Sequence, residues 1–395
     1  MPQIKPCVLY SIGARVGGGG LSLVAGQAID ALVKNQMLEK ALCYGTSRGY
    51  PSDHLTRLYF QPAKLFSHLP SKYYYRMKRE WMDWRTSHYL KSSSANIYHG
   101  WTHESLRSIR VAKSKGMLTI LERGNPHPNY VKKIHDEEAG HYGRKSNFII
   151  DDKNPFMRHF NHCRYEMDEA IAEIDEADYV FVNSDFCART YIDNGVSQQK
   201  VIVIPRGFEV DQFSSRPLQE DGDKFILLFV GQLMIRKGVK YLLDAWRELN
   251  LPNAELWFVG AVTKELDQLI DRERDAAAGI QYLGHVQDTS KYYQSASAFI
   301  LPSLDEGSAK VTYEAMASGL PCILTAETGS IADGSNAIII PIKSSVAIKS
   351  SILELYSNCK YRNQLGVKAR EAISKYTWDY YQHTLVDKYR ELLNP

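Results

Sequence analysis

The stretch from residue 299 to residue 321, FILPSLDEGSAKVTYEAMASGLP, restricts the fold more than any other part of the chain. An apolar strand over 298–301 ends at Pro302, and a loop of small residues follows. We predict a helix that begins at Lys310 and stops before Gly319 and the proline at 321, because glycine followed by proline ends helices. In α/β proteins a helix N-terminus behind a strand binds anions through its free N–H groups and its dipole.

Two carboxylates flank this predicted anion site. Glu306 lies in the loop and Glu314 lies inside the helix, with seven residues between them. At the rise of a helix they are at most roughly 12 Å apart. A nucleoside diphosphate-sugar has a matching layout, with an anionic diphosphate between two hydroxyl-rich rings, so one carboxylate would bind the ribose and the other the sugar. The alternative is an ordinary strand–loop–helix unit with two surface acids.

The residues around these acids resemble a known signature. Pro302-Ser303, Glu306-Gly307, Glu314-Ala315-Met316-Ala317, Gly319 and Pro321 stand in the register of the donor site of the retaining glycosyltransferase family 4, which has the GT-B fold. The family more often has an aromatic-Gly pair where this chain has Ser308-Ala309, and both replacements are small. The resemblance implies that Glu306 orients the donor sugar and Glu314 binds the ribose. It places the rest of the donor site at Gly307, Ser308, Ala309, Lys310 and Val311.

A second strong stretch, residues 225–241, predicts a buried strand that ends at Gly231 and is followed by Arg236-Lys237-Gly238 at a helix start. We expect Arg236 and Lys237 to meet the diphosphate through charge-assisted hydrogen bonds. The family commonly has Arg directly after the first glycine and Lys directly before the second. Lys237 fits the second position, whereas Gln232 occupies the first, and we expect Arg236 to substitute for the missing arginine.

The first half of the chain resembles the family only in layout. A strand over 8–10 precedes a predicted Gly-rich turn over 13–20, which resembles a loop of the family that faces the cleft and binds the donor. The donor-binding glycines expected there are Gly17, Gly18, Gly19 and Gly20. The family often has a functional histidine after a later strand, a position that either His99 or His103 fits, and we take His99 as catalytic. Arg123 follows the next strand, and we expect Arg123 and His103 on the acceptor side.

Residues 72–91 combine basic and aromatic side chains. Six basic residues and two acidic ones give this stretch a net charge of +4, against +3 for the whole chain. Such a composition suits an anionic acceptor or a peripheral contact with an anionic membrane. The alternative is a solvated helix whose aromatic side chains pack on the core.

Residues 125–168 contain five histidines and Cys163. His159-x-x-His162-Cys163 lacks the second pair that a zinc site requires. We therefore expect no metal site, and we interpret this segment as a loop-rich insertion over the acceptor side.

The predicted strands alternate with helices along all 395 residues, as in parallel sheets. The predicted fold class is α/β, GT-B, with two doubly wound, Rossmann-like domains facing a central cleft. We expect an acceptor-binding domain at 1–205 with insertions near 64–91 and 125–168, a donor-binding domain at 206–373, and a C-terminal helix at 374–395 that crosses back to the first domain. Six scattered cysteines and the lack of a long apolar run predict a cytoplasmic protein, peripheral at the membrane through 72–91.

The predicted function is that of a retaining glycosyltransferase. It would move a sugar, a hexose by preference, from a nucleoside diphosphate-sugar to a hydroxyl of a glycan, lipid or small molecule, as in polysaccharide biosynthesis. The resemblance implies no cofactor and no obligatory metal, and the charge of +3 gives no reason to expect nucleic acid. Two alternatives are another GT-B sugar-nucleotide enzyme, such as an epimerase, and a non-catalytic GT-B binding module.

Overall fold

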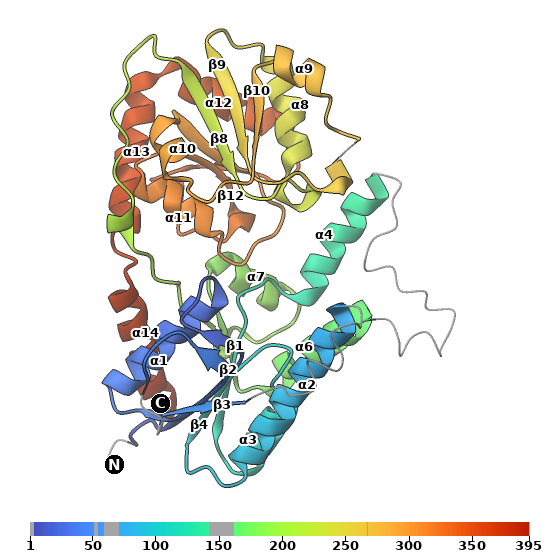
Figure 1. Cartoon of the computed structure of the whole chain (residues 1–395), viewed down its shortest axis with the longest axis vertical. Coiled ribbons are helices and arrows are strands. Elements are labelled where there is room, and N and C mark those ends of the chain that lie inside the picture. The colour runs from blue at the N-terminus through green and yellow to red at the C-terminus, as the bar shows by residue number, and fades with distance from the viewer. Residues whose placement is uncertain (1–3, 51–53, 59–70, 142–161, 267, 395) are drawn as a thin grey trace. The chain divides into compact units, whose positions relative to one another are not determined.

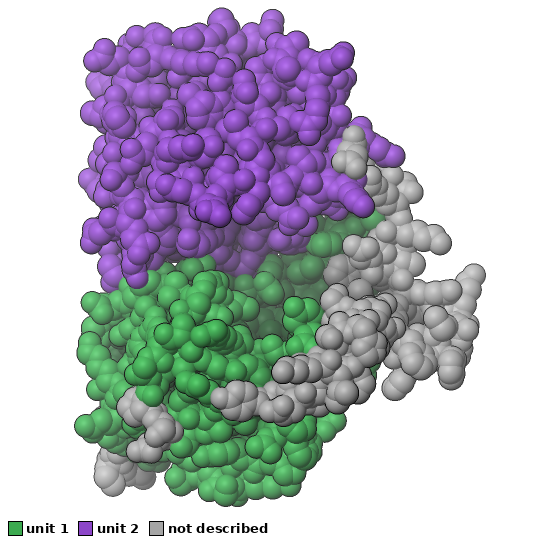
Figure 2. Space-filling view, in the orientation of Figure 1, with its two compact units in different colours: residues 1–183, 188–207, 378–395 green, residues 184–187, 208–377 purple. Residues whose placement is uncertain are grey.

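The computed structural model describes residues 4–50, 54–58, 71–141, 162–266 and 268–394. The chain divides into two compact units (Figures 1 and 2). Unit 1 comprises residues 1–183, 188–207 and 378–395, and unit 2 comprises residues 184–187 and 208–377.

The described part of unit 1 is built on a seven-stranded sheet in the order β3-β2-β1-β4-β5-β6-β7. Every pairing between neighbouring strands is parallel. The strands are β1 (Val8–Val16), β2 (Leu38–Thr46), β3 (Leu55–Arg57), β4 (Ile97–Trp101), β5 (Leu118–Glu122), β6 (Tyr179–Val182) and β7 (Val201–Val203). The short edge strand β3 was not predicted, because three residues carry no alternation that would reveal them.

The described helices of unit 1 lie between successive strands of its sheet, apart from α14, which follows unit 2 in the chain. They are α1 (Leu21–Lys34), α2 (Ser71–Leu90), α3 (Leu106–Ser114), α4 (Pro128–His141), α6 (His162–Glu176), α7 (Asp185–Asp193, of which 185–187 belong to unit 2), the 3-10 turn η2 (Gln198–Lys200) and α14 (Trp378–Leu393). Helix α1 begins at Leu21, directly after the glycines, but β1 continues to Val16, so the predicted glycine turn over 13–20 is reduced to 17–20.

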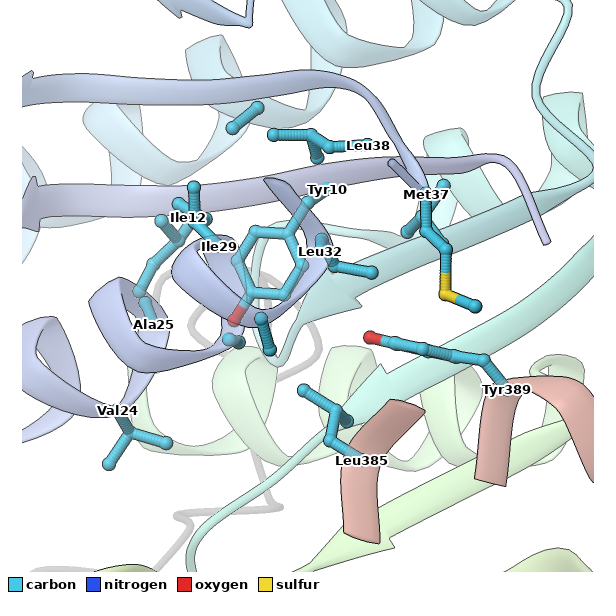
Figure 3. Packing of buried hydrophobic residues seen from close by; sticks show 14 of the residues in the cluster. Tyr10, Ile12, Val24, Ala25, Ile29, Leu32, Met37, Leu38, Leu385 and Tyr389 are labelled. Atoms are coloured by element: carbon cyan, nitrogen blue, oxygen red, sulfur yellow. The ribbon is translucent and has the colours of Figure 1, made fainter. Parts of the chain in front are cut away.

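Helix α14 packs on the first strand and the first helix, although it lies at the other end of the chain. Figure 3 shows Leu385 and Tyr389 of this helix beside Tyr10 of β1 and Leu32 of α1. These side chains belong to one apolar cluster, in which Tyr389 is fully buried. Apolar burial of this kind stabilises a fold by about 25 cal/mol per Å², so residues 378–393 are an integral part of unit 1.

The described part of unit 2 is built on a six-stranded sheet in the order β10-β9-β8-β11-β12-β13, again with parallel pairings. The strands are β8 (Phe225–Val230), β9 (Ala254–Val259), β10 (Ile280–Gly284), β11 (Ala298–Leu301), β12 (Cys322–Thr325) and β13 (Ile338–Ile340). Every residue of β8 and β11 is buried, as expected for central strands covered on both faces.

The helices of unit 2 are α8 (Val239–Leu249), α9 (Arg272–Ala277), α10 (Ser290–Ser295), α11 (Lys310–Ala317), α12 (Ser345–Ser357) and α13 (Cys359–Ile373). Short 3-10 turns are η3 (Val210–Gln212), η4 (Ile235–Lys237), η5 (Lys264–Leu266) and η6 (Ala326–Thr328). Helix α11 ends where predicted, because Gly319 adopts a left-handed conformation with φ 71°. Two doubly wound parallel-sheet units confirm the predicted α/β class.

The prediction of a loop-rich insertion over 125–168 is wrong for the described residues of that segment. They form helix α4 and the beginning of α6, while residues 142–161, including His159, lie outside the described part of the chain, as do 64–70 of the other predicted insertion. None of the described helices is long and apolar enough to cross a membrane. The described cysteines form no disulfide with one another, and Cys43, Cys187, Cys322 and Cys359 are buried.

Candidate active site

The predicted donor-site residues gather at one place in the sheet of unit 2. Strand β8 pairs with β9 on one side and with β11 on the other, so the strand order reverses at β8 and β11. In open parallel sheets, ligands bind outside the carboxyl ends of the strands at such a switch point. The loop after β8 carries Arg236 and Lys237, and the loop after β11 carries Glu306. The backbone joins these two loops directly, since the N–H of Leu304 donates to the carbonyl of Arg236 over 2.8 Å.

A cluster of two cations and two carboxylates forms between these loops. The Nη1 atom of Arg236 lies 3.1 Å from Oε1 of Glu306 and 2.8 Å from Oδ1 of Asp305. It also donates to the backbone carbonyl of Asp305 over 2.6 Å. Lys237 forms an ion pair with the same Oε1 atom of Glu306. Both predicted cations therefore meet the predicted sugar-orienting carboxylate.

The cluster is partly withdrawn from water. The side chains of Lys237 and Glu306 are only 12% and 15% exposed. Burial lowers the pKa of Arg236, but the carboxylates of Glu306 and Asp305 outweigh this effect and raise the pKa above its ordinary value. Because two positive charges face two negative ones, the cluster is close to neutral, and an anionic ligand would have to exchange with Glu306 to reach the cations.

The N-terminus of α11 carries no side-chain cap. Ala309 is the N-cap residue, and the first turn of α11 contains no acidic side chain. In the part of the chain described here, the amide N–H groups of Lys310 and Val311 find no acceptor. The hydroxyl of Ser308 lies 2.8 Å from that of Tyr313. A positive helix end with unused N–H groups is a ready anion site.

Glu314 lies on α11 and has partners different from those of Glu306. It is buried; Oε2 accepts a hydrogen bond of 2.8 Å from Tyr293, and Oε1 lies 2.5 Å from Nζ of Lys310. Burial raises the pKa of Tyr293 well above its ordinary value, and the Glu314 carboxylate adds to the effect, so this phenol remains a donor. The two predicted carboxylates thus have separate environments.

Glycines allow the loops to approach one another. A Cβ atom added to Gly238 would lie 2.0 Å from the carbonyl oxygen of Pro302, and Gly238 has φ 70°. A Cβ atom added to Gly260 would lie 1.9 Å from the carbonyl oxygen of Gly231, which itself has φ 138°. Another turn comes equally close to the donor loop, because a Cβ atom on Gly329 would lie 2.0 Å from the carbonyl oxygen of Gly307. Gln232 is exposed beside these glycines.

His99 does not occupy the position expected of a catalytic group. Its side chain is fully buried, with Nδ1 at 2.5 Å from the hydroxyl of Tyr389 and Nε2 at 3.1 Å from a carboxylate oxygen of Glu122. The ring also contacts Tyr10 and Phe181. A histidine enclosed in this way is a core residue of unit 1. The expectation that it reaches the sugar is wrong for this structure, because the sequence does not show that α14 covers this position.

The other predicted residues of unit 1 lie at the carboxyl edge of its sheet. Gly17 has φ 91° and Gly20 has φ 61°, and added Cβ atoms at Gly19 and Gly20 would meet nothing within 4 Å, so this turn presents open backbone. A Cβ atom added to Gly18 would also fit, since its nearest neighbour would be the Cβ atom of Ser22 at 3.6 Å.

His103 and Arg123 lie on neighbouring loops at that edge. His103 has φ 69°, an uncommon conformation for a residue with a side chain. Arg123 is buried, and its guanidinium donates to the hydroxyl of Thr102. The edge of this sheet therefore combines an arginine, a strained histidine and an open glycine turn.

Three acidic residues at these sites were not predicted. Asp305 binds Arg236, and the sequence signal for it was the pair of consecutive acids in the loop after β11. Glu104 accepts a hydrogen bond from the amide of Gly13, and burial raises its pKa to about 8. Glu173 of α6 accepts from the amides of His103 and Ser105 over 2.6 and 2.8 Å, which holds His103 in its strained conformation. Nothing local in the sequence connects Glu173 to that loop.

The described residues include no group of three or more His, Cys, Asp or Glu side chains that could hold a metal ion. The donor-site geometry instead offers cations and backbone N–H groups to an anion. Comparison with known proteins agrees with that chemistry: residues 224–358 match the family model described as glycosyl transferases group 1. This segment of unit 2 is therefore similar to the glycosyl transferases group 1 family.

Relatives of this segment come from distant organisms. An uncharacterized glycosyltransferase of Methanocaldococcus jannaschii is 28% identical over 211 residues, which are 51% of this chain and 58% of that protein. The chain spans about half the length of the curated relatives it matches. The match of residues 224–358 to the glycosyl transferases group 1 model confirms the predicted family resemblance for that segment.

Solved structures extend the likeness to the fold of both units. Sucrose-phosphate synthase from Thermosynechococcus elongatus has a TM-score of 0.67 at 18% identity, and the match covers 98% of this chain and 99% of that one. Anabaena HepE, solved in complex with UDP-glucose, has a TM-score of 0.58 at 13% identity, covering 96% of this chain and 98% of that one. The fold is GT-B.

Proposed function

We propose that this chain is a retaining glycosyltransferase that moves a sugar from a nucleoside diphosphate-sugar to an acceptor hydroxyl. One observation carries the proposal. Arg236, Lys237 and Glu306 come together at the switch point of the unit 2 sheet, inside the segment that matches the glycosyl transferases group 1 model. Anabaena HepE, which has the same fold, binds UDP-glucose, and this favours a uridine diphosphate-sugar as the first donor to test.

The diphosphate is the part of the donor that this site suits best. The uncapped N–H groups at Lys310 and Val311 and the positive end of α11 would bind its oxygens. Lys237 and Arg236 would exchange Glu306 for phosphate, and each charge-assisted hydrogen bond of this kind contributes roughly 1.5–3 kcal/mol. Glu306, released from Lys237, would then accept hydrogen bonds from the sugar hydroxyls, while Glu314 would accept hydrogen bonds from the ribose.

During transfer, the bond between the anomeric carbon and the diphosphate oxygen breaks and a bond to the acceptor oxygen forms. The leaving diphosphate carries the additional negative charge as the bond breaks, and its freed oxygen takes up the proton that the acceptor hydroxyl loses. Lys237, Arg236 and the helix terminus stabilise that charge as it develops, which lowers the barrier. The new bond forms on the same face of the sugar, as the family resemblance implies. No metal takes part in these steps.

The acceptor is proposed to bind unit 1. Arg123, His103 and the open turn at 17–20 lie at the carboxyl edge of its sheet, where ligands of parallel sheets bind. An acceptor hydroxyl on a glycan, a lipid or a small molecule fits this proposal.

Donor binding and transfer are tested with Lys237→Gln and a matched control. Lys240 lies three residues further along and pairs with Asp244 on the surface of α8, away from the cluster, so Lys240→Gln removes the same charge without touching the site. Isothermal titration with UDP-glucose, and with other sugar nucleotides in parallel, should show an affinity about 10- to 150-fold lower for Lys237→Gln alone. Equal affinities in the two variants would remove Lys237 from the donor site.

Incubation without an acceptor separates transfer from the epimerase alternative. A transferase should leave the sugar nucleotide unchanged until an acceptor hydroxyl is added, whereas an epimerase converts the sugar nucleotide alone. Tight binding of a sugar nucleotide with no conversion in the presence of a wide panel of acceptors would favour the non-catalytic module.

We also propose that helix α2 contacts an anionic membrane surface. Tyr75 is 53% exposed and Trp84 is 37% exposed. Trp81 stacks on Trp84 with ring centroids 5.2 Å apart, and the guanidinium of Arg85 lies over the Trp81 ring. Asp83 is turned inward to cap α3, and Arg76 and Arg79 pair with Glu80 and Glu166. The exposed side chains of α2 that remain for a membrane include Tyr75, Trp84 and Arg85. Such a face suits the headgroup region of a membrane.

A further inference from the structure

A cavity of about 400 Å³ lies in unit 2, apart from the donor cluster. It is bounded by the segment after η3 and by helix α13, and it is lined in part by Arg216 and Arg370. Arg236, Lys237, Glu306 and Glu314 are not among its lining residues. Its volume is within the range of roughly 300–1,000 Å³ that is usual for small-molecule sites.

Both arginines of the cavity donate to neutral oxygens. Arg216 is buried, and its guanidinium donates to the carbonyl of Gly319 over 3.2 Å and to Oδ1 of Asn363 over 3.1 Å. Arg370 donates to the carbonyl of Phe213 over 2.8 Å and to the carbonyl of Ala317. Within the described ranges, neither guanidinium forms an ion pair with a carboxylate.

A third arginine increases the uncompensated charge. Arg362 is buried next to Arg216 and donates to the carbonyl of Leu355 over 2.6 Å and to the side-chain oxygen of Gln219 over 3.1 Å. Burial, and then the charge of Arg362, lower the pKa of Arg216 to about 10. A buried cation without a counter-charge is costly, so an anion bound beside Arg216 and Arg370 would stabilise this region.

We propose that this cavity binds a small phosphate-bearing molecule. A planar guanidinium binds phosphate through two parallel hydrogen bonds, and the side chains of Ser215, Asn363 and Ser374 add polar groups to the lining. The exposed side chains of Leu218 and Val367 border the cavity and suit the non-ionic part of such a ligand. Glu371 also lines it, but two arginines outweigh this one carboxylate. The site is independent of the proposed glycosyltransferase activity.

The proposal is tested by isothermal titration and thermal shift on the full chain in phosphate-free buffer. The probes are ribose 5-phosphate, inorganic phosphate and ribose. We expect ribose 5-phosphate to bind and to raise Tm, and ribose to do neither. Arg370→Gln should lower the affinity for ribose 5-phosphate about 10- to 150-fold, the effect expected from the loss of one charge-assisted hydrogen bond. The matched control Lys368→Gln removes an exposed cation of the same helix that does not line the cavity and should bind as the wild type does.

Val367→Glu keeps the proposal falsifiable if Arg370→Gln fails to fold. Val367 is 49% exposed, so a glutamate there is tolerated, yet it places a negative charge at the cavity and should weaken phosphate binding. Inorganic phosphate that binds as tightly as ribose 5-phosphate would support the anion site and identify phosphate as the ligand. Binding that is lost in Lys237→Gln but kept in Arg370→Gln and Val367→Glu would place the phosphate in the donor site and overturn the proposal. Absence of binding by both phosphate probes at millimolar concentration would also overturn it.

Discussion

Exchanging each donor-site glutamate for glutamine should impair catalysis in two different ways. Glutamine has nearly the same shape as glutamate but no charge, so Glu306→Gln and Glu314→Gln remove one negative charge each. The structure gives these two carboxylates separate partners, Arg236 and Lys237 for Glu306, and Tyr293 and Lys310 for Glu314. The two substitutions therefore report on two different ends of the proposed donor.

The expected effect of Glu306→Gln follows from the cluster. Arg236 keeps its contacts of 2.8 and 2.6 Å to Asp305 in this variant, so it remains at the site. The cluster changes from a balance of two positive and two negative charges to a net charge of +1. Nucleoside diphosphate affinity should therefore not fall. The variant has no carboxylate beside the sugar when the anomeric carbon becomes positive in the transition state. We therefore expect kcat to fall about 10- to 150-fold, which corresponds to the loss of one charge-assisted hydrogen bond of roughly 1.5–3 kcal/mol.

The expected effect of Glu314→Gln is on binding. The ribose contact is present before, during and after transfer, so its loss weakens substrate and transition state equally. KM for the donor should rise, and nucleoside diphosphate affinity should fall by the same factor, while kcat changes little. Tyr293 keeps an acceptor in the glutamine amide oxygen, which protects the fold in this variant.

Steady-state kinetics gives kcat and KM for both variants, and calorimetry with the nucleoside diphosphate product gives the affinity independently. Circular dichroism and Tm confirm that each variant is folded. The assignment of the two ends is refuted if Glu306→Gln weakens the product as much as Glu314→Gln does. If neither substitution changes either quantity, these carboxylates are surface acids and the donor site lies elsewhere.

Three further predictions concern metal, membrane and pH. Donor affinity measured by calorimetry should be unchanged by EDTA, because cations and backbone N–H groups bind the diphosphate; activity lost in EDTA and restored by Mn²⁺ would contradict this. Sedimentation with anionic liposomes at low salt should fall for Arg85→Glu and not for Lys240→Glu on unit 2, and equal pelleting would remove α2 from the contact. Burial raises the pKa values of Glu104 and Glu169 from 4.5 to about 8, so the folded state binds protons that the unfolded state releases. The free energy of unfolding should therefore fall as pH rises from about 4.5 to about 8. Calorimetry at several pH values should show a weaker pH dependence for Glu104→Gln, and an unchanged slope would show that Glu104 does not titrate in this range.

The second half of the chain could be predicted closely because its signals are local. Strands β8 and β11 and helix α11 have the predicted bounds, since continuous apolar runs and a glycine-proline stop depend on neighbouring residues alone. The same holds for the position of Glu306 and Glu314 around the start of α11. Family resemblance added their roles, which local physics does not supply.

The first half could be predicted less well because its decisive contacts are distant in sequence. His99 was expected at the end of a strand, a position typical of ligand contacts, but it lies inside β4, and Tyr389, 290 residues further on, encloses it. Glu173 holds the loop of His103 from 70 residues away. Neither contact has a periodic or spacing signal. A single sequence therefore does not show that Tyr389 contacts His99 or that Glu173 contacts His103.

The departure at Gln232 shows how the fold can compensate for a missing charge. Arg236 lies after β8 and Asp305 after β11, 69 residues apart in sequence. Because these strands are neighbours at the switch point, the hydrogen bond from Leu304 to the carbonyl of Arg236 fixes one loop against the other. Asp305 then holds the guanidinium of Arg236 through both its backbone and its carboxylate, leaving Glu306 as the partner that a diphosphate displaces. We therefore propose that Arg236, oriented in this way, substitutes for the cation missing at position 232 when the diphosphate binds.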